Sequence, residues 1–364
     1  MSCVVAVEPV LPEHVYPQEE ITAAVGPLVA PDPVRTAVLR RLHAGCGVDH
    51  RHLVLPLEQY ADLHSLGATN AIFVREAAAL AERACRAALA RAGLTAQDVD
   101  HVFATSVTGV AAPSLDVLLA ERLGLRGDVR RTPSFGLGCA GGAAGLARVH
   151  DHLLGRPDDV ALLVSVELCS LTLQHGDDSG ANMVASGLFG DGAAAVVVVG
   201  ERHPLAADAP RADGGRRTAT LVDTRSRLYP GTTDALGWEV RDTGFAIVLS
   251  AELPALLGAH LPADVKGLLA DHDLTTADVP TWVVHAGGPR VIDAVRDALE
   301  LSEAAVAESR ASLACAGNLS SSSVLDVLAR TLARSEAPPG SPAVLMAFGP
   351  GVACELVLLR LGGR

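Results

Sequence analysis

The sequence predicts a duplicated α/β fold, in which two halves of the same plan each alternate helices with the strands of a buried sheet. Two pairs of segments support this prediction. Leu94–Ser106 has the pattern of a capped turn that leads into a strand, and Leu274–Ala286 repeats that pattern in the second half. Phe189–Val199 and Phe348–Leu358 share residue types and glycine positions. Near-continuous apolar strands of this kind belong in sheets that are covered on both faces.

The individual elements follow from local signals. A helix is predicted over residues 73–92, where strong helix formers carry spaced charges and Gly93 follows at the position of a helix C-cap. A second helix is predicted over residues 140–154, directly after a cysteine framed by glycines. The segment Thr281–His285 is predicted to be a strand that ends in a histidine, and a Gly-Gly-Pro turn comes shortly after it.

The length of the chain agrees with two halves. At 364 residues it is longer than one ordinary hydrophobic core supports. The polar segment Gly200–Arg217 is rich in proline and glycine and is the predicted join. We therefore expect a first half over residues 1–210 and a second half over residues 211–364.

Charge and cysteine content exclude several classes of function. With 42 acidic and 29 basic residues, the formal charge of -13 argues against binding to nucleic acid or to an anionic membrane. The 7 cysteines are scattered without a C-x-x-C pair, so we expect neither a metal site nor a disulfide framework. No signal peptide or membrane span is apparent, and we expect a soluble cytoplasmic protein.

Three polar residues stand at positions where chemistry is plausible. Cys139 precedes a predicted helix, whose N-terminus favours a thiolate; the alternative is a buried packing cysteine. His285 ends a strand, where a hydrogen bond to the backbone would also explain it. Asn318 occupies a helix N-cap position, and capping is its structural explanation.

The repeat predicts that these three residues share a pocket. When Leu94 is superposed on Leu274, Cys139 falls beside Asn318 and Thr105 falls on His285. If a pseudo-twofold axis relates the halves, the strand ends and helix starts at these positions meet near that axis. Cys139, His285 and Asn318 would then lie together.

These motifs, in this order, resemble the type III polyketide synthases of the thiolase superfamily. They are Gly-Cys-Ala-Gly-Gly at Cys139, His-Ala-Gly-Gly-Pro at His285, Gly-Asn-Leu-Ser-Ser at Asn318 and the terminal Phe-Gly-Pro-Gly that begins at Phe348. The resemblance covers nearly the whole chain. It implies a five-layered αβαβα thiolase fold, a homodimer, and an active site buried between the duplicated halves.

The resemblance also implies a mechanism that uses coenzyme A thioesters and no metal or redox cofactor. Cys139, as a thiolate paired with protonated His285, would take an acyl group from an acyl-CoA. Malonyl-CoA, or methylmalonyl-CoA, would lose CO2 while His285 and Asn318 donate hydrogen bonds to the enolate. The enolate would attack the acyl group on Cys139.

Further residues are expected at the substrate cavity by the same resemblance. Phe189 corresponds to one phenylalanine gatekeeper of the plant enzymes, and Ile247 stands at the position of the second. Thr172 and Ser320 correspond to cavity-lining positions, and Trp238 replaces a small residue. Ala112 is also expected at the cavity, where it replaces a bulky residue that reaches across the dimer and so opens one wall. Arg41 and Arg51 are expected at the tunnel mouth as partners of coenzyme A phosphates.

The pattern of cavity segments looks most similar to that of bacterial synthases that make alkylpyrones or alkylresorcinols from fatty acyl-CoA. We therefore expect an apolar acyl tunnel. Two other enzymes are open alternatives at this point: a ketoacyl-synthase III-like enzyme that performs one condensation on acyl carrier protein, and a cysteine hydrolase of acyl thioesters. A noncatalytic scaffold with the same fold is a third.

Overall fold

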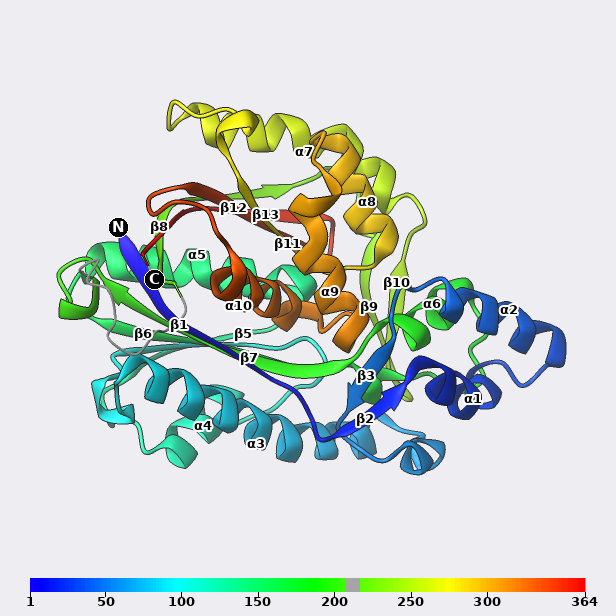
Figure 1. The fold of residues 1–364 in the computed structure, drawn as a ribbon. Coiled ribbons are helices and arrows are strands. Elements are labelled where there is room, and N and C mark those ends of the chain that lie inside the picture. Colours follow the sequence, from blue (N-terminus) through cyan, green and yellow to red (C-terminus); the bar gives the residue numbers. More distant parts are fainter. Residues whose placement is uncertain (207–216, 364) are drawn as a thin grey trace.

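The computed structural model describes residues 1–206 and 217–363. Figure 1 shows the arrangement of its helices and strands. The elements of the first half are β1 (Ser2–Val10), β2 (His14–Pro17), α1 (Gln18–Val29), α2 (Pro33–Ala44), β3 (His50–Leu53), α3 (Leu66–Ala92), β4 (His101–Thr105), α4 (Leu115–Leu123), β5 (Arg130–Ser134), α5 (Gly141–Gly155), β6 (Val160–Leu168), α6 (Gly180–Leu188) and β7 (Asp191–Gly200).

The second half continues the same alternation of helices and strands. Its elements are β8 (Ala219–Leu228), β9 (Leu236–Arg241), β10 (Gly244–Leu249), α7 (Leu253–Ala270), β11 (Thr281–Val284), α8 (Pro289–Ala298), α9 (Ala307–Ala316), α10 (Ser323–Arg334), β12 (Pro342–Gly349) and β13 (Ala353–Leu361). The predicted boundary between residues 210 and 211 lies outside the described residues.

The strand order repeats between the halves. Within the described residues, nine strands form one sheet in the order β11-β12-β13-β8-β1-β7-β6-β4-β5. The series β4-β6-β7-β1 has the same directions as β11-β12-β13-β8, namely one parallel pair followed by two antiparallel pairs. The short antiparallel pairing of β1 with β8 joins the two series. The duplication predicted from the sequence is therefore confirmed.

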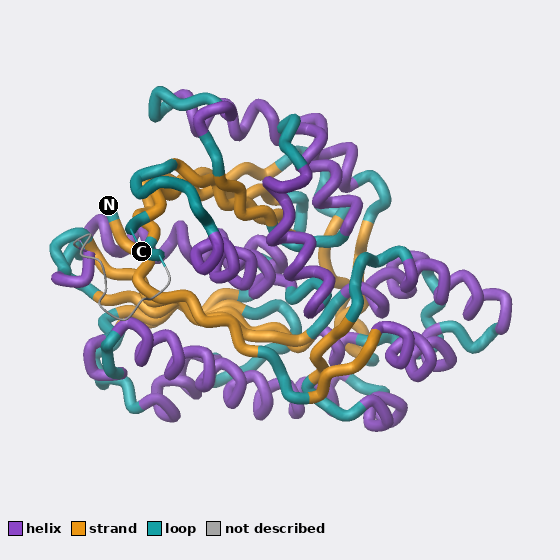
Figure 2. The backbone as a smooth tube through the Cα atoms, in the orientation of Figure 1, coloured by secondary structure: helices purple, strands orange, loops and turns teal. Residues whose placement is uncertain are grey.

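The two parts of the sheet and their helices form five layers (Figure 1). α3 and α4 cover the outer face of the first-half strands, and α7 and α8 cover the outer face of the second-half strands. α5 and α10 lie between the two parts of the sheet, as the separated strand layers in Figure 2 also show. This arrangement agrees with the predicted αβαβα order.

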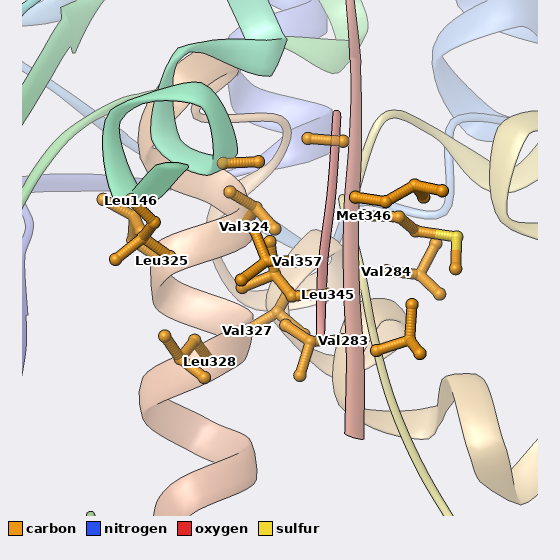
Figure 3. Packing of buried hydrophobic residues seen from close by; sticks show 14 of the residues in the cluster. Leu146, Val283, Val284, Val324, Leu325, Val327, Leu328, Leu345, Met346 and Val357 are labelled. Atoms are coloured by element: carbon orange, nitrogen blue, oxygen red, sulfur yellow. The ribbon is translucent and has the colours of Figure 1, made fainter. Parts of the chain in front are cut away.

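Both faces of the sheet are buried, as its apolar strands predict. Along β7, Ala194, Val196 and Val198 pack in the central core, while alternate residues pack in the cluster on the α3 side. In Figure 3, Val324 of α10 lies between Leu146 of α5 and residues of β11 and β12 such as Val284 and Met346. Burial of one such aliphatic side chain contributes about 2 kcal/mol to folding, so the central helix pair is firmly held.

The two sequence repeats have different outcomes in detail. Thr95 and Asp98 form a capping box before β4, and Thr275 and Asp278 form the same box before β11. The second pair of segments ends in corresponding strands, β7 and β13, but the glycines differ. Gly351 has a φ of 67° in the turn before β13, whereas the matching glycine lies inside β7.

The predicted helices are present, but one of them begins well before its predicted start. The helix predicted over residues 73–92 begins earlier, at Leu66, because the Ser65 side chain accepts a hydrogen bond from the backbone of Ala68 at 3.3 Å. It ends before Gly93, which has the expected left-handed conformation with a φ of 70°. In the ranges 1–206 and 217–363, no helix has the length and apolar character needed to cross a bilayer.

Candidate active site

Cys139 lies at the start of the central layer. It belongs to a single 3-10 turn, Gly138–Ala140, that leads directly into α5. Gly138 has a φ of 51°, and a Cβ atom there would clash with the ring of Pro350. A Cβ atom on Gly349 would likewise clash with the carbonyl of Leu137. The glycines around the cysteine are therefore required because the end of β12 presses against this turn.

Asn318 is held by the corresponding contact, in which a segment of the first half packs against a loop of the second half. Gly317 has a φ of 74°, and a Cβ atom there would lie 2.6 Å from the carbonyl oxygen of Leu188. The backbone N–H of Asn318 donates to that oxygen at 2.8 Å, and Gly190 donates to the Asn318 carbonyl at 3.0 Å. In each half, a Phe-Gly-x-Gly segment thus packs against a polar loop of the other half. Residues 189–192 contact the loop around Asn318, and residues 348–351 contact the loop around Cys139.

The Asn318 side chain has a fixed orientation. Its Oδ1 accepts hydrogen bonds from the backbone N–H of Ser320 at 2.8 Å and from the Ser323 hydroxyl at 3.2 Å. Because a backbone N–H can only donate, this contact identifies the oxygen of the amide. The Nδ2 group then points to the carbonyl oxygen of Gly287 at 3.4 Å. Asn318 therefore caps the following turn with its oxygen and offers its amide N–H groups on the other side.

His285 is buried directly after β11. Its backbone N–H donates to the carbonyl of Met346 at 2.9 Å, and its ring lies over Gly287, where a Cβ atom would be 3.1 Å from Cδ2. Within the described part of the chain, the ring Nδ1 has no hydrogen-bond partner. Burial lowers the pKa of His285 to about 4, so the imidazole is neutral at physiological pH and can accept a proton.

The Cys139 thiol faces the Asn318 loop. Its Sγ lies 3.6 Å from the hydroxyl of Ser320, a residue with a left-handed φ of 49°. Burial raises the pKa of Cys139 to about 12, although hydrogen bonds from Ser320 and Asn318 act in the opposite direction. The thiolate expected from the helix N-terminus is thus not the resting form. Among the described contacts, no hydrogen bond joins Cys139 directly to His285.

A buried carboxyl group supports this arrangement, and the prediction from sequence missed it. Glu167, within the largely apolar strand β6, accepts hydrogen bonds from Ser321, from the Val107 backbone at 3.0 Å and from Thr108 at 2.9 Å. Burial raises the pKa of Glu167. A charged residue inside an apolar strand was the available signal. The group links the Ser320–Ser322 turn to the ends of the first-half strands.

A pocket of about 500 Å³, partly open to solvent, lies next to the Asn318 loop, and its lining does not include Cys139, His285 or Asn318. It contains four of the predicted cavity residues: Phe189, Thr172, Trp238 and Ile247. It also contains apolar and polar residues that the sequence did not single out: Ile21, Val25, Leu53, Tyr60, Cys169, Ser170, Leu173, Asn182, Ala185 and Ser186. Phe189 connects the pocket to the polar loop, because it forms an isolated parallel bridge with Asn318.

The remaining predicted residues lie elsewhere. Ser320 contacts the thiol and is not part of this pocket lining, and Ala112 is exposed before Pro113. Arg41 is exposed on α2, in agreement with a surface position. Arg51 is not at the surface, and its expected place at the tunnel mouth is wrong. Only 3% of it is exposed, and it lines the pocket, because the pairing of β2 with β3 turns its side chain inward.

Comparison with known proteins agrees with this geometry. The chain matches the family of chalcone and stilbene synthases, with the N-terminal domain over residues 1–202 and the C-terminal domain over residues 220–361. It is 51% identical over 362 residues to a 1,3,6,8-tetrahydroxynaphthalene synthase of Streptomyces peucetius subsp. caesius, covering 99% of this chain and 93% of that protein. It is 30% identical to a phloroglucinol synthase of Pseudomonas fluorescens, covering 95% of each.

A solved structure shows the same likeness over the whole fold. The 1,3,6,8-tetrahydroxynaphthalene synthase of Streptomyces coelicolor A3(2) superposes with a TM-score of 0.90 at 33% identity, covering 99% of both chains. The expected thiolase-like fold is thereby confirmed. The chain belongs to the chalcone and stilbene synthase family and is a bacterial type III polyketide synthase, an acyltransferase that performs decarboxylative condensation.

Proposed function

We propose that this synthase makes an aromatic product of the 1,3,6,8-tetrahydroxynaphthalene type, with malonyl-CoA as both primer and extender. The observation that carries the proposal is the 51% identity, over 99% of the chain, to a relative with that name. The solved structure that matches with a TM-score of 0.90 belongs to a second synthase of the same name. This primer is shorter and more polar than the fatty acyl group expected from the sequence.

The chemistry of that product explains the choice of primer. All ten of its carbon atoms lie in the rings, which corresponds to five two-carbon units. One ring closes between the second and seventh carbons of the chain, and the other closes between the last carbon and the thioester carbonyl. The last carbon must therefore act as a nucleophile. A carboxylate on that carbon supplies the electron pair when it leaves as CO2, and malonyl is the primer that carries one.

In this mechanism Cys139 is the nucleophile. His285, neutral at rest, accepts the thiol proton as Sγ attacks the thioester carbonyl of malonyl-CoA. The bond between that carbonyl and the coenzyme A sulfur breaks, and the leaving thiolate takes the proton from His285. A thiol that is protonated at rest agrees with proton transfer during loading, instead of a standing ion pair.

Asn318 and His285 assist the extension step. A second malonyl-CoA loses CO2, and the amide Nδ2 of Asn318 and the imidazole donate hydrogen bonds to the enolate oxygen. Donors that are held in place before the reaction contribute about 3 kcal/mol each. The enolate carbon then attacks the acyl carbonyl on Cys139, the bond to Sγ breaks, and the chain leaves two carbons longer on coenzyme A. These steps need coenzyme A thioesters and no metal or redox cofactor.

A fatty acyl primer that leads to an alkylpyrone or alkylresorcinol is the second candidate. The observation in its favour is the run of aliphatic residues in the pocket, among them Ile21, Val25 and Leu53. Burial of a hydrocarbon chain against such residues is worth about 0.8 kcal/mol per CH2 group. Trp238 and Phe189 occupy space in the same pocket, which favours the shorter primer.

A homodimer is part of the proposal. Val110 and Phe135 are large apolar residues that are 45% and 52% exposed. They follow the neighbouring strands β4 and β5, which pair up to Thr105 and Ser134, and the exposed Ala112 lies in the same region of the chain. A second copy of the chain would cover this apolar surface.

One incubation tests the proposed primer. The purified protein is given malonyl-CoA alone, and the products are identified by mass spectrometry against synthetic 1,3,6,8-tetrahydroxynaphthalene. We expect this compound, or its oxidation product, without any added starter. A requirement for long-chain acyl-CoA would overturn the malonyl primer and support the second candidate. Free malonic acid without condensation would indicate a hydrolase, and arrest after one extension would indicate a single-condensation enzyme.

A further inference from the structure

Arg51 is a buried cation with an incomplete set of partners. Its Nε donates to Oε1 of Gln18 at 3.0 Å, and its Nη1 donates to the carbonyl of Phe189 at 2.7 Å. Its Nη2 is buried and has no hydrogen-bond partner among residues 1–206 and 217–363. Both of its acceptors are neutral. The side chain lines the pocket, so the free N–H groups belong to a residue that a bound molecule can reach.

Because Arg51 is charged, the lack of a partner for its Nη2 is energetically unfavourable. Burial lowers the pKa of Arg51 to about 10, which still leaves the guanidinium charged at neutral pH. In the described residues it forms no ion pair. Asp191 attracts it from a distance, but the Asp191 carboxylate is occupied by Val54 and Ser170. A buried cation without an anionic partner is unfavourable, and a carboxylate presented to Nη2 would relieve the cost.

The position of Arg51 connects the pocket to the reacting groups. The Phe189 carbonyl that accepts from Nη1 belongs to the residue that pairs with Asn318. The aliphatic part of the Arg51 side chain also packs against the loop that contains Asn318, since a Cβ atom on Gly317 would lie 3.2 Å from Cγ and Cδ of Arg51. The pocket that Arg51 lines is therefore joined, through Phe189 and Gly317, to the loop that faces the Cys139 thiol.

We propose that Arg51 is the specificity-determining residue that binds the terminal carboxylate of the malonyl primer on Cys139. This inference rests on the proposed function. The carboxylate oxygens accept from Nη2, while Nε and Nη1 stay bonded to Gln18 and Phe189. The contact selects a primer that ends in a carboxylate over one that ends in a methyl group. It also protects the carboxylate from early loss while the primer is on Cys139, because a cation holds the negative charge there.

Loading of Cys139 tests this assignment in a protein that cannot decarboxylate the primer. The Asn318→Asp variant keeps the oxygen that accepts from Ser320 and removes the amide donors, so malonyl-Cys139 accumulates. Intact-protein mass spectrometry then gives the rate of acylation by malonyl-CoA and by hexanoyl-CoA. Adding Arg51→Met is expected to slow malonyl loading about tenfold or more, the effect of losing a charged hydrogen bond. Hexanoyl loading is expected to change less than about threefold.

Matched variants separate recognition from structure. Arg51→Lys keeps a charge in the pocket and is expected to recover part of the malonyl loading. Arg156→Met, which removes an exposed arginine after α5, is expected to leave both rates unchanged. Equal loss of malonyl and hexanoyl loading in Arg51→Met, with an unchanged melting temperature, would overturn the proposal. Unchanged malonyl loading would also overturn it.

A change in the substrate keeps the test valid if the Arg51 variants do not fold. Malonamoyl-CoA, with an amide in place of the carboxylate, is offered to the Asn318→Asp protein. We expect loading about tenfold slower than with malonyl-CoA, and equal rates would overturn the proposal. Failure of the Arg51 assignment can also be distinguished from failure of the proposed function. If the unaltered protein forms no product from malonyl-CoA alone, the proposed function fails; if it does and Arg51→Met does as well, only the role of Arg51 fails.

Discussion

Asn318 shows how one side chain serves both structure and chemistry. Its Oδ1 caps the Ser320–Ser322 turn, which is the structural explanation that the sequence allowed, and its Nδ2 is directed away from that turn. The two explanations considered from the sequence are therefore compatible. Ser320, in a left-handed conformation, completes the loop and brings its hydroxyl to the thiol of Cys139.

Asn318→Asp separates these two functions of the side chain. The aspartate retains the acceptor for the Ser320 N–H but lacks the donor for an enolate oxygen. We expect decarboxylation of malonyl-CoA to fall about a hundredfold or more, measured as CO2 release. Acylation of Cys139 is expected to persist. Ser323→Ala, which removes one of the two contacts to Oδ1 together with the acceptor of the Leu319 N–H but keeps the amide donors, serves as the control and is expected to have a much smaller effect. Undiminished CO2 release from Asn318→Asp would contradict the assigned role.

Among the secondary-structure elements, the contact of β12 with the Cys139 turn constrains the site most directly. Gly349 ends β12, and its missing side chain allows the carbonyl of Leu137 and the side chain of Ala140 to approach. The turn can therefore hold Cys139 at the start of α5 only while this position is glycine. The glycine repeat in the sequence was visible, but the residues that it contacts were not, because they lie far away along the chain.

Gly349→Ala tests this contact. The added methyl group must displace the Cys139 turn, so we expect a loss of product formation of at least tenfold and a lower melting temperature, with destabilisation of about 1–3 kcal/mol. Gly258→Ala in α7 is the matched control. No atom would lie within 4 Å of its Cβ, and alanine favours a helix over glycine by about 1 kcal/mol. An active and stable Gly349→Ala protein would show that the turn adapts.

A second contact between elements, at Asp191, predicts that the stability of the fold depends on pH. Asp191, at the start of β7, accepts hydrogen bonds from Val54 after β3 and from Ser170 before α6. Burial raises the pKa of Asp191 from its usual 3.8 to about 6. The folded state thus binds the proton more tightly than the unfolded state, and this contribution to stability is lost as the pH rises from about 4 to about 6.

Replacement of the Asp191 carboxyl group removes its contribution to the pH dependence of stability. We expect the free energy of unfolding of Asp191→Asn, relative to that of the unaltered protein, to shift in favour of the variant between about pH 4 and pH 6. Urea unfolding at a series of pH values measures the difference. Parallel profiles for the two proteins would show that Asp191 titrates alike in the folded and unfolded chains.

On the scale of the whole molecule, the duplication made the fold and the three polar residues predictable. Local caps and apolar runs repeat along the chain, and superposing the repeats brings Cys139, His285 and Asn318 to related positions. The burial of Arg51 was not predictable, because it depends on pairing between β2 and β3 and on Gly317, far along the chain. The role of Glu167 depends on hydrogen bonds from the distant Ser321. The pocket includes α1 residues that carry no motif at all.

The proposed dimer is a prediction on the same scale. For a chain of 37.4 kDa, we expect light scattering to give twice this mass. Phe135→Asp places a charge on the exposed apolar surface after β5 and is expected to shift the protein toward the monomer. Leu154→Asp, at a leucine that is 55% exposed near the end of α5, is the control and should leave the mass unchanged. A monomeric unaltered protein would refute the dimer.

The reciprocal contacts between the Phe-Gly-x-Gly segments and the polar loops also limit how such enzymes can be recombined. Gly190 and Gly317 contact one another's loops across the halves, and Gly138 contacts Pro350 in the same way. A chimera that takes residues 1–206 from this chain and the remainder from a relative keeps each loop but changes the segment pressed against it. Compatible parents must therefore have co-adapted loops, and diversity in product is more readily gained by altering the pocket than by exchanging halves.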